Sequence, residues 1–262
     1  MSYHEEMISA FDTAADTYGE HANIQRKVAD GLIASLIPWK EAVPEGTILE
    51  VGCGTGFVSE QLIDQFPESE IIISDISEKM LETCRNNLIE SGKDLSRVTF
   101  KIINADTFKA ENKDIGLVIS GFAPHWFKDP SLALQNLSEA LTPGGMLLCS
   151  FPGNHTFPAW YENCLELGLP HTANPLPDVE EVVVKLSMGP LQIDYYENDL
   201  FHEFESSLEF FRHLKKTGES YSVLGKSLNY KQFKLLLEHW DNKGNLNMKW
   251  HIVYVAAKRD FE

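Results

Sequence analysis

Short apolar runs alternate with amphipathic stretches from residue 47 to residue 151, and this alternation constrains the fold more than any other feature. The apolar runs have the length of strands buried on both faces, and the stretches between them have helical spacing. Such strands pair in parallel through right-handed crossovers, with helices covering both faces. The pattern predicts an α/β fold with a doubly wound sheet. The predicted strands are 47–51, 70–74, 98–104, 117–120 and 146–151, with helices at 57–66, 77–91 and 131–141.

Further elements flank this core, and no linker rich in Pro, Gly or Ser divides the 262 residues. The flanking helices are predicted at 5–18, 21–37, 157–167, 179–187, 206–217 and 230–241, with extended runs at 191–204 and 248–258. We therefore expect a single domain over 1–262. Its parts would be an N-terminal helical cover (1–40), a ligand-binding core (41–151), and a helical cap with the last strands (152–262).

Charge and cysteine content narrow the class of partner. The chain has 39 acidic and 22 basic residues, and its net charge of −17 disfavours a nucleic-acid partner. The four cysteines lack metal-ligand spacing, so we expect free thiols and no metal site. The acidic N-terminus has no signal-peptide pattern, and no apolar run nears the roughly 20 residues that span a bilayer. These features favour a cytoplasmic protein without a membrane partner.

The run LEVGCGTG (49–56) follows a predicted strand and opens a predicted helix, which is the position of a nucleotide-binding loop. Its spacing is G-x-G-x-G, whereas dinucleotide sites have G-x-G-x-x-G. Glu50 precedes the loop, and a pyrophosphate there would face a carboxylate in a crevice of low dielectric. S-adenosylmethionine has no phosphate and carries a sulfonium and an ammonium. The charge pattern therefore favours S-adenosylmethionine over a nicotinamide dinucleotide.

Acidic residues also follow the next two predicted strands. Asp75 stands where a carboxylate accepts both ribose hydroxyls, and Asp106 can accept from the adenine amino group. Taken singly, each has a simpler explanation in turn geometry or helix capping, although Ser77 is the better cap after Asp75. Ligands bind at the carboxyl ends of strands in such sheets, so the ordered set indicates a site.

Residues 47–151 thus resemble class I S-adenosylmethionine-dependent methyltransferases. LEVGCGTG resembles their first motif, Asp75 their ribose acid, and Asn104-Ala105-Asp106 their adenine-side motif. The resemblance implies a Rossmann-like fold whose seven-stranded, mostly parallel sheet has the order 3-2-1-4-5-7-6, with the seventh strand antiparallel. The cofactor contacts that we expect are Gln25, Glu50, Gly52, Cys53, Gly54, Gly56, Asp75, Ile76, Met80, Asp106, Thr107 and Ser120.

Three segments outside the glycine loop bear on the methyl acceptor. They are 11–25 with Tyr18 and Gln25, ISGFAPHW (119–126), and FESSLEFFRHLKKTG (204–218). Together they resemble the malonyl-acyl-carrier-protein O-methyltransferases of biotin synthesis. This chain has His125 where that family usually has Gln, and Glu219, Ser220 and Tyr221 where small residues are usual. The resemblance implies methylation of the free carboxylate of a malonyl thioester, carried by acyl carrier protein or coenzyme A.

Three residues are candidates for roles toward the acceptor. Arg212 is our first choice to hold the carboxylate, since a guanidinium can donate two parallel hydrogen bonds. Tyr18 is expected near the methionine end of the cofactor or the acceptor. His125 would matter as a base only for a protonated acceptor such as a phenol or an amine. The simpler readings are that Arg212 lies on a helix surface and that Tyr18 is a packed aromatic. The neighbouring Trp126 is expected to form a wall of the site.

The segment 206–234 contains six basic and two acidic residues in an otherwise acidic chain. Such a segment indicates a docking face for an anionic partner such as an acyl carrier protein, or else the solvated faces of two helices. Two other functions stay open from the sequence. One is a methyltransferase for a hydroxyl, a nitrogen or a different carboxylate, and the other is a non-catalytic cofactor-binding protein.

Overall fold

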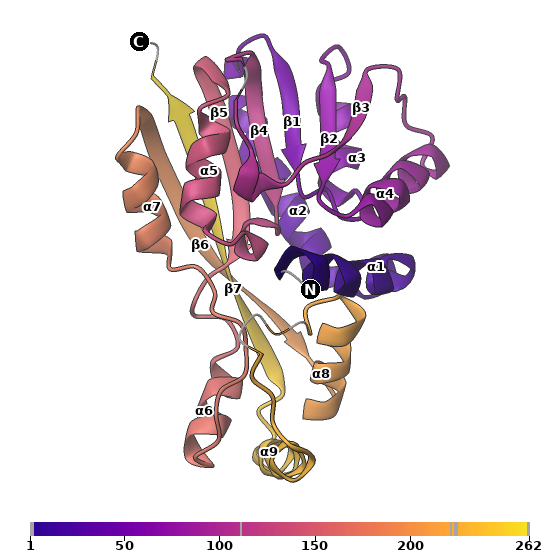
Figure 1. Ribbon diagram of the computed structural model, residues 1–262, viewed down its shortest axis with the longest axis vertical. Coiled ribbons are helices and arrows are strands. Elements are labelled where there is room, and N and C mark those ends of the chain that lie inside the picture. Colours follow the sequence, from indigo (N-terminus) through magenta and orange to yellow (C-terminus); the bar gives the residue numbers. More distant parts are fainter. Residues whose placement is uncertain (1–2, 111, 221, 223–224, 261–262) are drawn as a thin grey trace.

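The computed structural model describes residues 3–110, 112–220, 222 and 225–260. Its seven-stranded sheet has the order β3-β2-β1-β4-β5-β7-β6 (Figure 1), which confirms the predicted topology. Strands β1 to β5 pair in parallel, whereas β7 is antiparallel to both β5 and β6. The strands are β1 (Thr47–Val51), β2 (Ile71–Asp75), β3 (Val98–Ile102), β4 (Ile115–Gly121), β5 (Leu141–Pro152), β6 (Leu191–Glu203) and β7 (Asn247–Arg259).

Helices cover both faces of this sheet, as the alternating pattern predicted. The α-helices are α1 (Tyr3–His21), α2 (Asn23–Leu36), α3 (Phe57–Gln65), α4 (Glu78–Glu90), α5 (Pro130–Ser138), α6 (Pro158–Glu166), α7 (Val179–Ser187), α8 (Ser207–Lys216) and α9 (Tyr230–Lys243). Short 3₁₀ turns are η1 (Ile37–Ala42), η2 (Ala105–Thr107) and η3 (Pro124–Trp126). No helix in the described part of the chain is long and apolar enough to cross a membrane.

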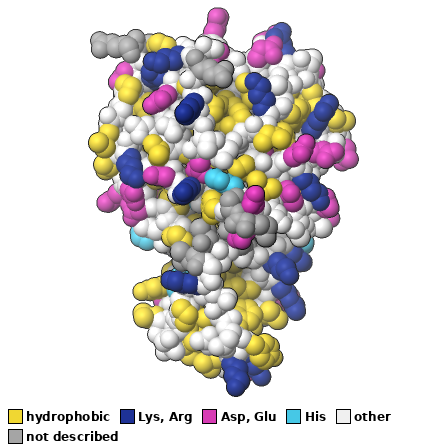
Figure 2. All heavy atoms as spheres, viewed as in Figure 1, with side chains coloured by type: hydrophobic (Ala, Val, Ile, Leu, Met, Phe, Trp, Pro, Cys, Tyr) yellow, Lys and Arg dark blue, Asp and Glu magenta, His cyan; other side chains and the backbone are white. Residues whose placement is uncertain are grey.

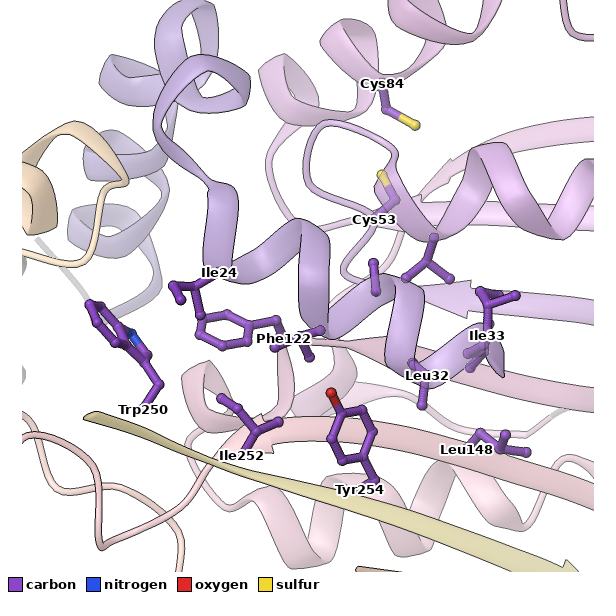
Figure 3. Close-up of a cluster of buried hydrophobic side chains, with 14 of the residues drawn as sticks. Ile24, Leu32, Ile33, Cys53, Cys84, Phe122, Leu148, Trp250, Ile252 and Tyr254 are labelled. Atoms are coloured by element: carbon purple, nitrogen blue, oxygen red, sulfur yellow. The ribbon is translucent and has the colours of Figure 1, made fainter. Parts of the chain in front are cut away.

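Two apolar clusters hold the layers together. One joins α2, α3 and α4 to one face of the sheet, and Figure 3 shows Ile24, Leu32 and Phe122 packed within it. The other joins α5 and α7 to the opposite face through residues such as Leu134 and Leu186. Because apolar surface is removed from water on both faces, the parallel strands are held with their carboxyl ends at one edge.

Local signals explain where several helices begin. The Ser77 hydroxyl accepts a hydrogen bond from the Met80 amide at the start of α4, as its position after Asp75 predicted. Asn229 and Gln232 form a reciprocal capping box at the start of α9. One predicted boundary was wrong. The fifth strand was expected at 146–151, but β5 begins at Leu141 and includes residues 143–145, where the pairing with β4 shifts register.

The long strands β6 and β7 run beyond the rest of the sheet, and α6, α8 and α9 surround their ends (Figure 1). We call α6, α8, α9 and these strand ends the cap. Its interior is aromatic and centres on Phe210, whose ring centroid lies 5.0 to 6.5 Å from those of its neighbours. These neighbours are Phe157, Trp160, Phe204, Phe211, Trp240 and Trp250.

We expect Phe210→Ala to lower the free energy of unfolding by about 3 to 5 kcal/mol, because it leaves a cavity among packed rings. The matched control is Phe201→Ala on β6, where the side chain is 51% exposed. That change should cost less than about 1 kcal/mol. Urea denaturation followed by tryptophan fluorescence measures both. Equal losses for the two variants would contradict the central place of Phe210.

Candidate active site

The glycine loop joins β1 to α3 at the carboxyl edge of the sheet. Gly52 has φ of +76°, and a Cβ there would come within 2.4 Å of the Ala123 side chain. Gly54 has φ of +52°, and a Cβ there would meet no atom within 4 Å. Only glycine adopts these conformations without strain. The loop therefore leaves an open hollow above Gly54, bounded by the turn that follows β4.

Glu50 lies under this loop and is only 1% exposed. The Ser59 hydroxyl on α3 donates a 2.6 Å hydrogen bond to its carboxylate. Burial raises the pKa of Glu50 to about 8, against the lowering effect of that hydrogen bond. A cationic ligand beside Glu50 would favour its charged form and offset the cost of burial.

The two strand-end acids are fixed by backbone amides. Asp75 accepts hydrogen bonds from the amides of Gly54 and Ser77, both at 2.9 Å. Burial raises its pKa, and these amide hydrogen bonds oppose the rise. Asp106 accepts from the Lys128 amide at 2.9 Å, and its second oxygen lies 2.7 Å from Nε2 of His4. Both carboxyls line the same cavity as Glu50.

Helix α1 lies next to the carboxyl ends of β1 and β2 in Figure 1, and its side chains line this cavity. Met7, Phe11 and Tyr18 of α1 line the cavity along with His4. The helix is held by polar contacts to the strand ends, since the Ser77 hydroxyl donates to Asp12 at 2.6 Å. Burial and the nearby carboxylates of Glu219 and Asp75 raise the pKa of Tyr18. Its phenol is therefore a hydrogen-bond donor at neutral pH.

Gln25 on α2 provides a test of whether S-adenosylmethionine suits this cavity. Its amide nitrogen donates a 2.5 Å hydrogen bond to Glu219, and its buried Oε1 has no partner among the described residues. A buried acceptor without a donor is costly. The ammonium of the methionine end would supply that donor, with Glu50 as a counter-charge. Asp75 and Asp106 would provide carboxylate oxygens for the ribose hydroxyls and the adenine amino group.

A second cavity adjoins the first. Its volume is about 970 Å³, whereas the volume of the first cavity is about 110 Å³. It lies between the turn after β4 and the cap, and its walls include aromatic side chains such as Trp160, Phe211 and Trp250. The two cavities share Phe122, Trp126 and Glu219. A methyl group that passes from one cavity to the other must therefore pass these three side chains.

His125 lies in the wall of the second cavity, between Phe122 and Trp126. Burial lowers the pKa of His125 to about 3. Its imidazole is therefore neutral at physiological pH, and it is a very weak base. This disfavours proton removal from a phenol or an amine by His125.

The structure brings most of the expected cofactor residues together. Besides the acids and Gln25, the cavity walls include Gly52, Cys53, Gly54, Ile76 and Met80. Three expected residues lie elsewhere. Gly56 begins α3 and faces Cys84, where a Cβ would come within 3.0 Å of the sulfur. The Ser120 hydroxyl is buried and donates to the Val51 carbonyl, and Thr107 is exposed on η2.

Arg212 is exposed on α8 and lines neither cavity. The expectation that it holds the acceptor carboxylate inside the site is therefore not supported by its position. Conversely, the sequence reasoning missed Phe122 and Glu219, which lie where the cavities meet. Phe122 has a positive φ of 54°, and roles were predicted for its neighbours Ser120 and His125 but not for Phe122 itself.

His155, Glu197 and His251 come together on the face of β6 and β7, with potential ligand atoms within 4.8 Å of one another. These three residues lie far apart in the sequence, so their spacing does not predict the cluster. His251 Nε2 lies 2.5 Å from a carboxylate oxygen of Glu197, and the His155 and His251 rings are tilted by 39° with centroids 5.0 Å apart. The contact with Glu197 occupies Nε2 of His251, whereas its buried Nδ1 has no partner among the described residues.

Comparisons with known proteins agree with this geometry. A family model described as a methyltransferase domain matches residues 48–145. The chain is 33% identical over 202 residues to a malonyl-acyl-carrier-protein O-methyltransferase of Magnetococcus marinus, covering 77% of this chain and 72% of that one. It is 30% identical to the biotin biosynthesis bifunctional protein BioCD of Bordetella avium, covering 89% of this chain and 48% of that one.

Among solved structures, the YcgJ protein of Bacillus subtilis superposes with a TM-score of 0.63 at 15% identity. That alignment covers 88% of this chain and 99% of YcgJ. The fold and the cofactor cavity define a class I S-adenosylmethionine-dependent methyltransferase. Within this class, the chain belongs to the malonyl-acyl-carrier-protein O-methyltransferase family.

We expect the affinity for S-adenosylmethionine to rise between about pH 6 and about pH 7.5. In the free protein Glu50 is largely protonated at these pH values, because its pKa is raised to about 8. A bound cation favours the carboxylate, so binding releases a proton and strengthens as pH rises. Glu50→Gln should weaken binding roughly tenfold at the upper pH and remove most of this dependence.

Isothermal titration calorimetry at several pH values measures this effect. The control is Glu68→Gln, which changes an exposed carboxylate before β2. An affinity of the wild type that is independent of pH would contradict the role of Glu50.

Proposed function

We propose that this protein transfers the methyl group of S-adenosylmethionine to the free carboxylate of a malonyl thioester in biotin synthesis. The observation that carries the proposal is the large second cavity, which meets the cofactor cavity at Phe122, Trp126 and Glu219. Its volume of about 970 Å³ suits a thioester on a long prosthetic arm. The family relatives are named for the same reaction.

A carboxylate acceptor suits the chemistry of this site. S-adenosylmethionine, when bound, supplies an electrophilic methyl group. A malonyl carboxylate is ionised at neutral pH, since the reference pKa of a carboxyl group is about 4. It therefore needs no general base, and the protein has only to align the oxygen and exclude water. The weak basicity of His125 disfavours the alternative acceptors that need proton removal.

Tyr18, Gln25 and Glu50 surround the region where the methionine end of the cofactor is expected. Their phenol, amide oxygen and carboxylate would orient it so that the methyl faces the second cavity. Trp126 and Phe122 would form the walls at the point of transfer and keep water out. Loss of the carboxylate charge would let the acyl group pass as an apolar one in later elongation.

We infer that an acyl carrier protein docks on the basic face of the cap. Within the segment 206–234, of which 221, 223 and 224 lie outside the described residues, α8 exposes Arg212, Lys215 and Lys216. Lys231 and Lys234 are exposed on α9, and Lys226 lines the second cavity. Figure 2 shows Lys and Arg side chains over α8 and at the lower end of the cap. We assign Arg212 to this docking face, and malonyl-coenzyme A is the alternative acceptor.

The four cysteines are buried and free, which supports a reducing, cytoplasmic setting. The net charge of −17 still argues against nucleic acid as a partner.

The direct test is transfer of a labelled methyl group from S-adenosylmethionine to malonyl-acyl carrier protein and to malonyl-coenzyme A. We expect a base-labile methyl ester on the malonyl group and release of S-adenosylhomocysteine. Acetyl-acyl carrier protein, which has no free carboxylate, is the control acceptor. Cofactor binding without transfer to either malonyl thioester would overturn the proposed function and favour a non-catalytic role.

For docking, we expect Lys215→Glu combined with Lys216→Glu to raise KM for malonyl-acyl carrier protein roughly tenfold, through loss of charge complementarity. The readout is the ratio of kcat/KM for the carrier protein to kcat/KM for malonyl-pantetheine. Lys113→Glu changes an exposed lysine outside the cap and serves as the control. If the ratio stays the same in both variants, the carrier protein does not dock on this face.

A further inference from the structure

Glu219 is the only acidic side chain among the three residues that line both cavities in the described part of the chain. It lies in the loop after α8, two residues beyond the buried Thr217. Gly218, between them, packs so closely on α1 that a Cβ would come within 2.8 Å of the Phe11 ring. The loop is therefore anchored at the point where α1 meets the cap.

The carboxyl group of Glu219 faces neutral partners. One oxygen accepts the 2.5 Å hydrogen bond from the Gln25 amide. Among the described residues, no Lys or Arg forms an ion pair with it. The titratable or charged groups that line the two cavities besides Glu219 are His4, Tyr18, Glu50, Cys53, Asp75 and Asp106 on the cofactor side, and His125, His155, Tyr161, His171, Lys226 and Lys249 on the acceptor side.

None of these groups compensates a negative charge on Glu219. Lys249 is paired with Asp199 at 3.1 Å, and Lys226 is exposed. Tyr18, which interacts electrostatically with Glu219, is a neutral phenol. Burial raises the pKa of Glu219 to about 7, and the hydrogen bond from Gln25 opposes the rise. A substantial share of the protein therefore carries Glu219 as the neutral acid at physiological pH.

We propose that Glu219, as the neutral carboxylic acid, donates a hydrogen bond to the acceptor carboxylate at the point of methyl transfer. This proposal rests on the proposed function, because it requires an anionic acceptor in the second cavity. Gln25 engages Oε1, so the proton is free to lie on Oε2. The acceptor carboxylate attacks with one oxygen, and its other oxygen needs a donor in a site lined by aromatic rings.

The ionised form of Glu219 would act in the opposite way. Two carboxylates in one desolvated junction repel each other, so ionisation of Glu219 would weaken acceptor binding. The proton stays on Glu219 during the reaction, because the acceptor oxygen attacks the methyl carbon directly and the methyl–sulfur bond breaks. Glu219 is thus a specificity residue for a carboxylate acceptor and acts as a hydrogen-bond donor, not as a general acid.

The test is the pH dependence of kcat/KM for malonyl-pantetheine, measured at saturating S-adenosylmethionine. This acceptor has one titratable group, which is ionised throughout the range. For the wild type we expect kcat/KM to fall roughly 20-fold between about pH 6.5 and about pH 8.5, as Glu219 loses its proton. For Glu219→Gln, whose amide is a donor at every pH, we expect a change of less than about twofold.

Two further variants complete the test. Glu219→Ala, which has no donor, should lower kcat/KM for the acceptor at every pH while its Kd for S-adenosylmethionine changes less. Glu203→Gln changes an exposed carboxylate on β6 and should keep the wild-type pH profile. A flat wild-type profile, or the same alkaline fall in Glu219→Gln, overturns this inference alone. Absence of methyl transfer by the wild type overturns the proposed function and this inference together.

Discussion

A desolvated carboxylate at the end of β1 is the constraint on which the site depends. Glu50 is almost fully buried, and it receives one hydroxyl hydrogen bond from Ser59 in place of its hydration. The ionised form of this carboxyl group is costly unless a positive charge arrives to compensate it. The glycine loop above it admits a ligand, and Asp75, Asp106 and the Gln25 Oε1 provide further acceptors in the same cavity. The cavity therefore selects for a cationic nucleoside and against one that carries a pyrophosphate.

The second constraint is that several distant segments must meet to complete the site. The strand ends provide the acids, α1 provides one wall, and the loop after α8 provides Glu219. The hydrogen bond from Gln25 to Glu219 joins α2 to the cap across the boundary of the two cavities. A change in the position of α1 or the cap would therefore alter both cavities. This coupling suits a reaction in which two ligands must be aligned before transfer.

Much of this arrangement could be predicted because it is local in sequence. The strands, the glycine loop and Asp75 occupy neighbouring positions in a repeating unit, and the topology of such units is restricted. Gly56 and Ser120 lie in the same motifs but face Cys84 and the Val51 carbonyl instead of the cavity. Proximity in a motif does not determine the direction of a side chain, which depends on packing.

The acceptor side was less predictable because tertiary packing positions it. The periodicity of α8 does not reveal which of its polar residues faces the cavity, and Phe210 and Leu214 turn inward while Arg212 faces solvent. Glu219 follows the end of that helix in a segment without periodicity. At the junction it is held by the hydrogen bond from Gln25 and by the close packing of Gly218 on Phe11. These placements depend on contacts between residues about 200 positions apart.

Two carboxyl groups with raised pKa values lie on opposite sides of the transfer point, and their preferred protonation states differ. Glu50 favours a cationic cofactor when it is ionised, whereas the role inferred for Glu219 requires its proton. Burial raises the pKa of Glu50 to about 8 and that of Glu219 to about 7. Bound cofactor brings a positive charge next to Glu50 and favours its ionised form, whereas the role inferred for Glu219 requires that its proton persists in the complex. Cofactor binding would in this way prepare the site for an anionic acceptor without the cation that the sequence suggested.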